Sequence, residues 1–209
     1  MSTRRRDGGD GRFWPMLLVL VLLLSACGRD AEFSGTALEP PSAAPNFALT
    51  NQFGESVTLA SLRGKVVVLT FLYTSCPDFC PLVTSKMAQV RDEFGDRSSR
   101  LAFVVISVDP ARDSVVVVRK YLQVRGLELK LSYLTGDAAA LRPVWQEYAI
   151  GVTAEKPAGK NKAIYEVGHS DALYLIDKEG RERVLMSSDF APAHLARNLN
   201  SLLRESEDS

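Results

Sequence analysis

The stretch that most constrains this fold is an apolar run that ends beside two closely spaced cysteines. Residues 66–73 (VVVLTFLY) are almost all aliphatic or aromatic, a pattern typical of a strand that is buried on both faces of a sheet. The run leads to Cys76 and Cys80, and a helix is expected from Pro81 to Phe94 because proline fits the first helical position. Two thiols at a strand-to-helix turn indicate soft-metal or redox chemistry.

The rest of the chain alternates between strand and helix patterns. We expect a hairpin over 47–58, strands over 101–108, 131–134, 172–177 and 184–186, and helices over 114–124, 137–148 and 193–204. The valines at 115–118 would also suit a strand, but Asp113 or Ser114 as a cap and Gly126 as a stop favour a helix, and Asp137 is expected to cap the next one. The polar stretch 153–167 indicates an exposed excursion or a hairpin. This order predicts an α/β, thioredoxin-like fold: a mixed central β-sheet flanked by helices, with an N-terminal β-hairpin.

The first 26 residues resemble the signal peptide of a bacterial lipoprotein. Arginines at 4–6 precede an apolar segment over 16–26, which has the length of a signal-peptide core and is short for a bilayer span of about 20 residues. The segment ends in Leu-Ser-Ala-Cys-Gly, similar to a lipobox, in which the cysteine (here Cys27) is lipidated. The alternative is an uncleaved membrane anchor that starts at Phe13.

The residues after the signal peptide set the expected domain boundary and location. Residues 27–45 are rich in Gly, Ala, Ser and Pro, so we expect a lipidated N-terminus and flexible tether there, and one domain over 46–209. A lipidated Cys27 implies a membrane-anchored protein on the extracytoplasmic (periplasmic) side of a bacterial cell envelope. The 25 basic and 25 acidic residues balance, so no excess charge favours a nucleic-acid partner.

In that oxidising compartment the two remaining thiols, Cys76 and Cys80, need a purpose other than stability. A disulfide that closes so short a loop stabilises a fold only slightly. Thiolates select Cu(I), and imidazole also suits copper, which makes the two histidines of the chain candidates for a third ligand. We interpret His194, in the expected last helix, as a surface residue. His169 directly precedes a strand and is expected to face the cysteine turn, so it is the stronger candidate.

Three motifs together resemble those of the Sco/SenC family. They are FLYTSCPDFCP at 71–81, VDPARDS at 108–114 and HSDALYLID at 169–177. The resemblance covers about residues 45–203. It implies a copper chaperone that passes its metal to the CuA centre of cytochrome c oxidase subunit II, together with a copper donor and a thiol reductant as further partners.

The resemblance also implies the roles of particular residues. Cys76, Cys80 and His169 would bind one copper ion, as Cu(I) and with Cu(II) left open, and oxidation of the two cysteines to a disulfide would abolish the site. Asp109 and Asp78 would stand next to the ligands. The plainer interpretations are a turn residue for Asp109 and a helix-end charge for Asp78.

Other activities of this fold fit the residues less well. A thiol-disulfide reductase acting on the oxidase or on other extracytoplasmic proteins is the main alternative, so whether the chain is an enzyme stays open. Ordinary reductases of this fold use Cys-x-x-Cys and carry a proline where this chain has His169 and Ser170. A peroxiredoxin turn would have proline and threonine at positions 69 and 73, which are Leu69 and Tyr73 here. Structural zinc would need a fourth ligand.

Overall fold

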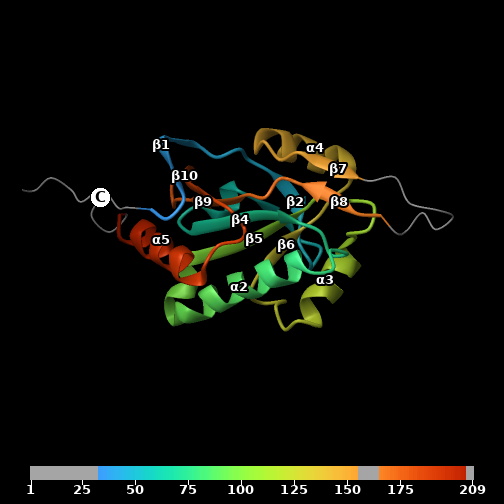
Figure 1. The fold of residues 1–209 in the computed structure, drawn as a ribbon, viewed down its shortest axis with the longest axis horizontal. Coiled ribbons are helices and arrows are strands. Elements are labelled where there is room, and N and C mark those ends of the chain that lie inside the picture. The colour runs from blue at the N-terminus through green and yellow to red at the C-terminus, as the bar shows by residue number, and fades with distance from the viewer. Residues whose placement is uncertain (1–32, 155–164, 206–209) are drawn as a thin grey trace, which may run out of the picture. The chain divides into compact units, whose positions relative to one another are not determined.

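A six-stranded mixed sheet forms the centre of the domain in the computed structural model, which describes residues 33–154 and 165–205 (Figure 1). The strand order is β1 (Thr36–Ala43), β10 (Arg181–Met186), β9 (Leu173–Ile176), β4 (Val66–Leu72), β5 (Leu101–Ser107) and β6 (Ser132–Leu134). Strands β4, β5 and β6 run parallel, whereas β9 is antiparallel to β4 and to β10. The predicted mixed central sheet is confirmed.

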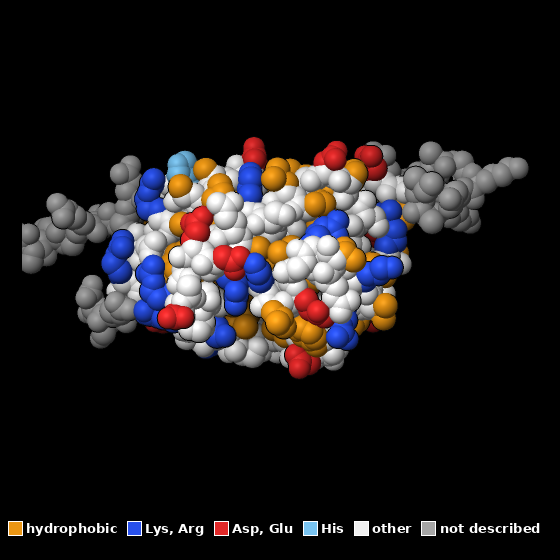
Figure 2. Space-filling model, turned by 90° about the horizontal axis from the view of Figure 1, so that it is seen from below, with side chains coloured by type: hydrophobic (Ala, Val, Ile, Leu, Met, Phe, Trp, Pro, Cys, Tyr) orange, Lys and Arg blue, Asp and Glu red, His pale blue; other side chains and the backbone are white. Residues whose placement is uncertain are grey.

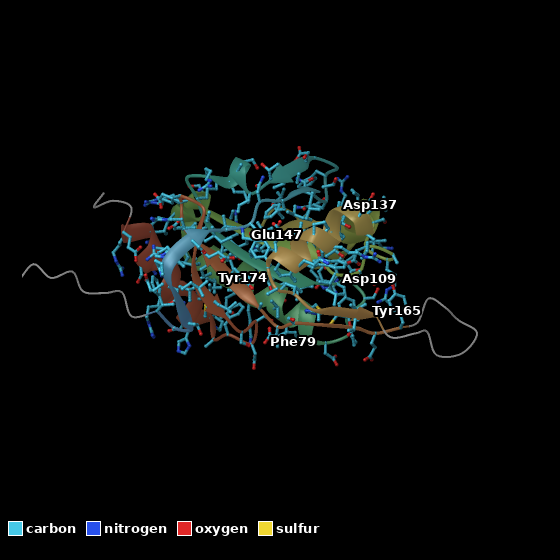
Figure 3. All side chains as sticks on the ribbon, turned by 90° about the horizontal axis from the view of Figure 1, so that it is seen from above. Phe79, Asp109, Asp137, Glu147, Tyr165 and Tyr174 are labelled. Carbon is cyan, nitrogen blue, oxygen red and sulfur yellow. The ribbon has the colours of Figure 1, made fainter. Side chains whose placement is uncertain are left out.

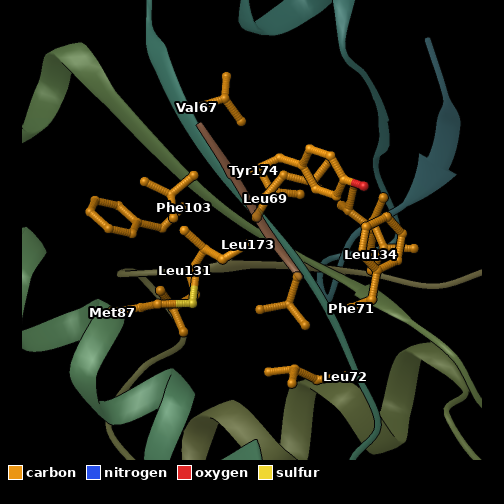
Figure 4. Packing of buried hydrophobic residues seen from close by; sticks show 14 of the residues in the cluster. Val67, Leu69, Phe71, Leu72, Met87, Phe103, Leu131, Leu134, Leu173 and Tyr174 are labelled. Carbon is orange, nitrogen blue, oxygen red and sulfur yellow. The ribbon is translucent and has the colours of Figure 1, made fainter. Parts of the chain in front are cut away.

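Strand β4 lies in the middle of this sheet, and all seven of its residues are buried. Figure 4 shows its side chains packed among residues of the neighbouring strands and Met87 of the helix that follows. Such a strand needs apolar side chains on both faces, which explains the unbroken run that the sequence shows. The run therefore fixes the carboxyl end of β4, where the cysteines begin, in the best-packed part of the domain.

In the described part of the chain, four α-helices flank the sheet. They are α2 (Phe79–Glu93), α3 (Val115–Gln123), α4 (Ala138–Glu147) and α5 (Pro192–Glu205). In Figure 1, α4 lies on one side of the sheet and the other three lie on the opposite side. The Ser114 hydroxyl accepts from the Val117 backbone N–H, and Asp137 accepts from that of Ala140, so both predicted caps are confirmed. Acidic, basic and hydrophobic side chains are interspersed on the face seen in Figure 2.

Two short hairpins complete the domain. β2 (Ala48–Thr50) pairs with β3 (Ser56–Thr58), which confirms the predicted N-terminal hairpin, and β7 (Val152–Ala154) pairs with β8 (Val167–His169). Residues 155–164, within the predicted excursion, lie outside the described part of the chain. Two 3₁₀ turns follow β3 and α2 at Ala60–Leu62 and Gly95–Arg100.

The domain begins earlier than the sequence predicts. Residues 36–43 were expected in the tether over 27–45, but they form β1, which pairs with β10. Pro40 and Pro41 obscured this strand; both are tolerated because β1 is the edge strand of the sheet. The boundary predicted at residue 46 is therefore wrong for residues 36–43.

The predicted signal peptide and the lipidation site at Cys27 lie outside the described residues. Over residues 33–154 and 165–205, no helix combines the length and the apolar character needed to span a membrane.

Helix α2 also begins earlier than predicted. It starts at Phe79, with Asp78 as the N-cap residue, so Cys80 lies in the first turn of the helix and is not its cap. Pro81 is tolerated there because the first four backbone N–H groups of a helix have no partner within it. The earlier start places several free N–H groups beside the sulfur of Cys76.

Candidate functional site

The two cysteines lie at the carboxyl end of β4, where the chain turns into α2. Both are free thiols; Cys76 is half-buried and Cys80 is buried. The Cys80 backbone N–H donates to the Cys76 sulfur at 3.4 Å, because the helical first turn brings residue 80 back over residue 76. The pair therefore presents one accessible sulfur with a second sulfur behind it.

The surroundings give the two thiols opposite acidities. Burial raises the pKa of Cys76, but hydrogen bonds from the Cys80 thiol and from the backbone N–H groups of Cys80, Asp78 and Phe79 outweigh it, so the pKa is lowered. Burial raises the pKa of Cys80 far above the ordinary value, and the neighbouring Cys76 raises it further. Hydrogen bonds to a charged form favour that form, whereas burial disfavours it. Cys76 is thus the thiol more ready to ionise.

Tyr73 connects the cysteine turn to strand β8. Its hydroxyl contacts the Cys76 sulfur and the Val167 backbone N–H, and its pKa is raised by burial and then by the charge of Cys76. Its ring meets the His169 ring edge-on, with the centroids 6.0 Å apart and the planes at 90°. Tyr73 therefore contacts both the cysteine turn and the histidine.

His169 ends β8 with one ring nitrogen already engaged. Its Nδ1 lies 3.0 Å from the Ser170 carbonyl oxygen, which can only accept a hydrogen bond, so Nδ1 carries the proton. In the neutral ring this leaves the lone pair on Nε2, the arrangement that metal-binding histidines use. In the described residues, however, no three His, Cys, Asp or Glu side chains are grouped closely enough to hold a metal. The complete set of Cys76, Cys80 and His169 stays a prediction.

The loop after His169 is held in place by Asp171. This carboxylate accepts from the Ser187 hydroxyl at 2.6 Å, and from the Ser188 backbone N–H at 2.8 Å and its hydroxyl. Burial raises the pKa of Asp171, but these bonds and the nearby His169 lower it overall. The loop is thereby fixed to the end of β10.

Asp109, a predicted neighbour of the metal ligands, is buried at the end of β5. It accepts from the Tyr165 hydroxyl at 2.6 Å and forms an ion pair with Arg112. Figure 3 shows Asp109 and Tyr165 close together beside the β7–β8 hairpin. The plain interpretation as a turn residue is incomplete, because the carboxylate joins two separate segments.

Asp78 and His194 have simpler surroundings. The Asp78 side chain is exposed and makes no capping hydrogen bond, while its backbone N–H contributes to the group around Cys76. His194 is exposed on α5, as expected of a surface residue.

Sequence reasoning missed one residue that shapes the cysteine turn. Asp113, considered only as a helix cap, is 1% exposed and accepts from the Thr74 backbone N–H at 3.2 Å, from the Thr74 hydroxyl, and from the Ser107 hydroxyl at 2.7 Å. Burial raises its pKa. The signal was available: Asp113 stands in the motif at 108–114, directly after a buried strand.

Fold and site together define a class, a thioredoxin-like domain with a Cys-x-x-x-Cys turn at the end of its central strand and a histidine across an aromatic ring. The comparison with known families is specific. The model of the SCO1/SenC family matches residues 35–204, and the chain therefore belongs to the SCO1/SenC family.

Individual relatives agree with this assignment. An SCO2-like protein of Rickettsia prowazekii is 31% identical over 135 residues, which cover 65% of this chain and 64% of the relative. The copper-bound structure of Bradyrhizobium japonicum ScoI is 29% identical with a TM-score of 0.69, covering 77% of this chain and 99% of that one. A SCO1/SenC family lipoprotein from Bacillus anthracis is 26% identical with a TM-score of 0.66, over 80% and 99%.

Proposed function

We propose that this protein is a membrane-tethered copper chaperone. It binds one copper ion through Cys76, Cys80 and His169 and delivers it to the CuA centre of cytochrome c oxidase subunit II. The observation that carries the proposal is the site geometry: two reduced thiols share one turn, and a histidine with Nε2 as its lone-pair nitrogen lies across Tyr73 from them. The similarity to a structure solved with copper bound supports it.

The proposed ligands suit Cu(I). Thiolate sulfur is a soft ligand that selects Cu(I), and imidazole suits copper in either oxidation state. Cys76 is prepared for metal binding because N–H donors already stabilise its thiolate. Cys80 supplies a second sulfur on the protein side of the metal, where water has little access.

Delivery follows from an open coordination sphere. Cu(I) has a filled d shell and imposes little geometric preference, so an incoming thiolate or imidazole can bind before a chaperone ligand leaves. Copper then moves by successive ligand exchange, without release of the free ion. Oxidation of Cys76 and Cys80 to a disulfide removes both sulfur ligands, so loading requires a thiol reductant as well as a copper donor.

Titration with Cu(I) tests the proposal directly. We expect the reduced domain of residues 28–209 to bind about one Cu(I), and Cys76→Ser, Cys80→Ser and His169→Ala each to weaken binding. His194→Ala is the matched control, since this exposed histidine lies on α5. Unchanged affinity in His169→Ala would contradict the three-ligand site.

A thiol-disulfide reductase is the second candidate function, and one observation favours it. A half-buried thiol of lowered pKa in front of a buried thiol of raised pKa is the arrangement of an attacking and a resolving cysteine. The same His169→Ala variant separates the two functions. A reductase would keep reducing a partner disulfide at the normal rate without the histidine.

The membrane attachment is proposed through lipidation of Cys27, on the extracytoplasmic side of the cell envelope. The sequence before Cys27 supports it, and the relative from Bacillus anthracis is described as a lipoprotein. Intact-mass analysis of the membrane-extracted protein should find a mature chain that starts at a diacylated Cys27. A chain that keeps residues 1–26 would contradict this attachment.

A further inference from the structure

One short loop contacts both sides of the candidate site. It comprises residues 109–113, between β5 and α3. The buried carboxylate of Asp113, the last residue of the loop, binds the backbone N–H and the hydroxyl of Thr74, which opens the cysteine turn. Asp109 and Arg112, in the same loop, bind Tyr165, which leads into β8 and His169. The two segments that carry the predicted ligands are thus tied to the same five residues.

Arg112 contacts residues on both sides of the candidate site. Its guanidinium pairs with Asp109, donates from Nη1 to the Tyr165 carbonyl oxygen at 2.9 Å, and lies 3.8 Å from the centre of the Tyr165 ring. It also lies 5.7 Å from the centre of the Tyr73 ring, the ring that meets His169. The arginine therefore interacts both with Tyr73, just before the cysteine turn, and with Tyr165, two residues before β8.

We infer that Arg112 is a positioning residue that sets where His169 lies relative to Cys76 and Cys80. This inference rests on the proposed copper site and assigns no metal ligand of its own. Within residues 33–154 and 165–205, strands β7 and β8 pair only with each other and do not extend the central sheet. Side-chain contacts at Tyr73 and Tyr165 therefore link the hairpin to the cysteine turn, in addition to the bonds by which Asp171 fixes the loop after His169.

The chemistry of arginine suits this task. A guanidinium is planar and always charged, so it can pair with a carboxylate in its plane while its faces stack on aromatic rings. Lysine supplies the charge but neither the planar fork nor the stacking surface. Asp109 is 3% exposed, and a carboxylate buried to that degree needs a cationic partner. The pair therefore ties Tyr165 to the loop through charge, hydrogen bonds and stacking together.

Without Arg112, we expect copper to be held by the two sulfurs alone. Loss of a residue that orients a metal ligand typically lowers metal affinity by about 10- to 100-fold. Arg112→Ala should therefore lower Cu(I) affinity by an amount similar to His169→Ala. X-ray absorption of the copper-loaded variant should show two sulfur neighbours and the loss of the nitrogen neighbour, a change that general destabilisation would not produce.

The experiment measures Cu(I) affinity by competition with a chelator, and the copper neighbours by X-ray absorption, in the reduced domain of residues 28–209. Arg112→Lys should resemble Arg112→Ala, because charge alone does not replace the fork. Tyr165→Phe keeps the stacked ring and loses only the bond to Asp109, so its effect should be smaller and in the same direction. Arg119→Ala is the matched control, because this arginine of α3 contacts Glu128 and Phe53 instead.

The decisive comparison is the double variant. Arg112→Ala with His169→Ala should bind copper no more weakly than His169→Ala alone, because both changes remove the same contribution. Additive losses, or a retained nitrogen neighbour in Arg112→Ala, would overturn the positioning role. If His169→Ala itself left affinity and neighbours unchanged, the proposed copper site would fail, and the positioning role with it. Should Arg112→Ala not fold, Tyr165→Phe with and without His169→Ala supplies the same comparison.

Discussion

The unequal surroundings of the two thiols predict unequal reactivity. In the reduced, metal-free protein, iodoacetamide should modify Cys76 well before Cys80. The thiolate is the reacting species; the pKa of Cys76 is lowered by hydrogen bonds, whereas burial raises that of Cys80. Cys80 is also only 1% exposed, so the reagent reaches it only after local opening.

The contribution of Cys80 to this reactivity can be given a magnitude. Hydrogen bonds to charged groups are worth about 1.5–3 kcal/mol, and the lower end applies because the Cys76 sulfur is half-exposed. Since about 1.4 kcal/mol corresponds to a tenfold change in an ionisation equilibrium, Cys80→Ala should raise the pKa of Cys76 and lower its thiolate fraction. Near neutral pH, where the thiolate fraction limits the rate, alkylation of Cys76 should slow by roughly tenfold.

The assay is a time course of alkylation between pH 5 and 9, followed by intact mass and peptide mapping. The rate at Cys76 should rise with pH along a curve whose midpoint lies below the ordinary thiol pKa, and should level off above it. Phe79→Ala keeps the backbone N–H groups and serves as a control for side-chain changes in the same turn. Equal rates at the two cysteines, or a faster Cys80, would refute the assigned asymmetry.

Two further predictions concern the residues that hold the site and the start of the domain. Burial raises the folded-state pKa of Asp113 above the value of 3.8 for a free carboxyl, so its stabilising contribution is complete below pH 3.8 and is lost as the pH rises through the folded-state pKa. The free energy of unfolding, measured with urea between pH 4 and 7, should therefore decline with pH, and Asp113→Asn should reduce that decline. An unaltered decline in the variant would argue against this role of Asp113. Asn198 is 1% exposed and binds the backbone N–H and carbonyl of Ser34 at 2.9 and 2.8 Å. Asn198→Leu should therefore lower the free energy of unfolding by about 2 kcal/mol and speed proteolysis within residues 33–43. Unchanged cleavage would show that Asn198 does not hold the start of the domain.

Much of the fold was predictable because local signals and burial agree. The run at 66–73 predicts a central strand, and the caps at Ser114 and Asp137 place two helices correctly. Strand β1 was missed because its prolines and small residues resemble a linker, and its pairing with β10 is a long-range contact that no local pattern encodes. The start of α2 was misplaced because proline is tolerated throughout the first turn, not only at its first position.

The candidate site was predictable only in part. Cys76, Cys80 and His169 have side chains whose chemistry is visible in the sequence itself. The residues that connect them are ordinary types, Tyr73, Arg112 and Tyr165, whose importance comes from stacking and pairing between segments far apart in the chain. A spacing pattern cannot reveal such contacts, since the same tyrosines and arginine elsewhere would be unremarkable.

Under the proposed function, the burial difference between the two sulfurs sets an order for copper transfer. An incoming ligand can reach the metal only from the exposed side, where Cys76 and His169 lie, because Cys80 is covered by the domain. Cys76 or His169 is therefore displaced first, and Cys80 leaves last. A surface dithiol with two equally exposed sulfurs would impose no such order and could release the ion to either side. At the proposed site, burial of one thiol would thus confine the exchange to the face that carries Cys76 and His169.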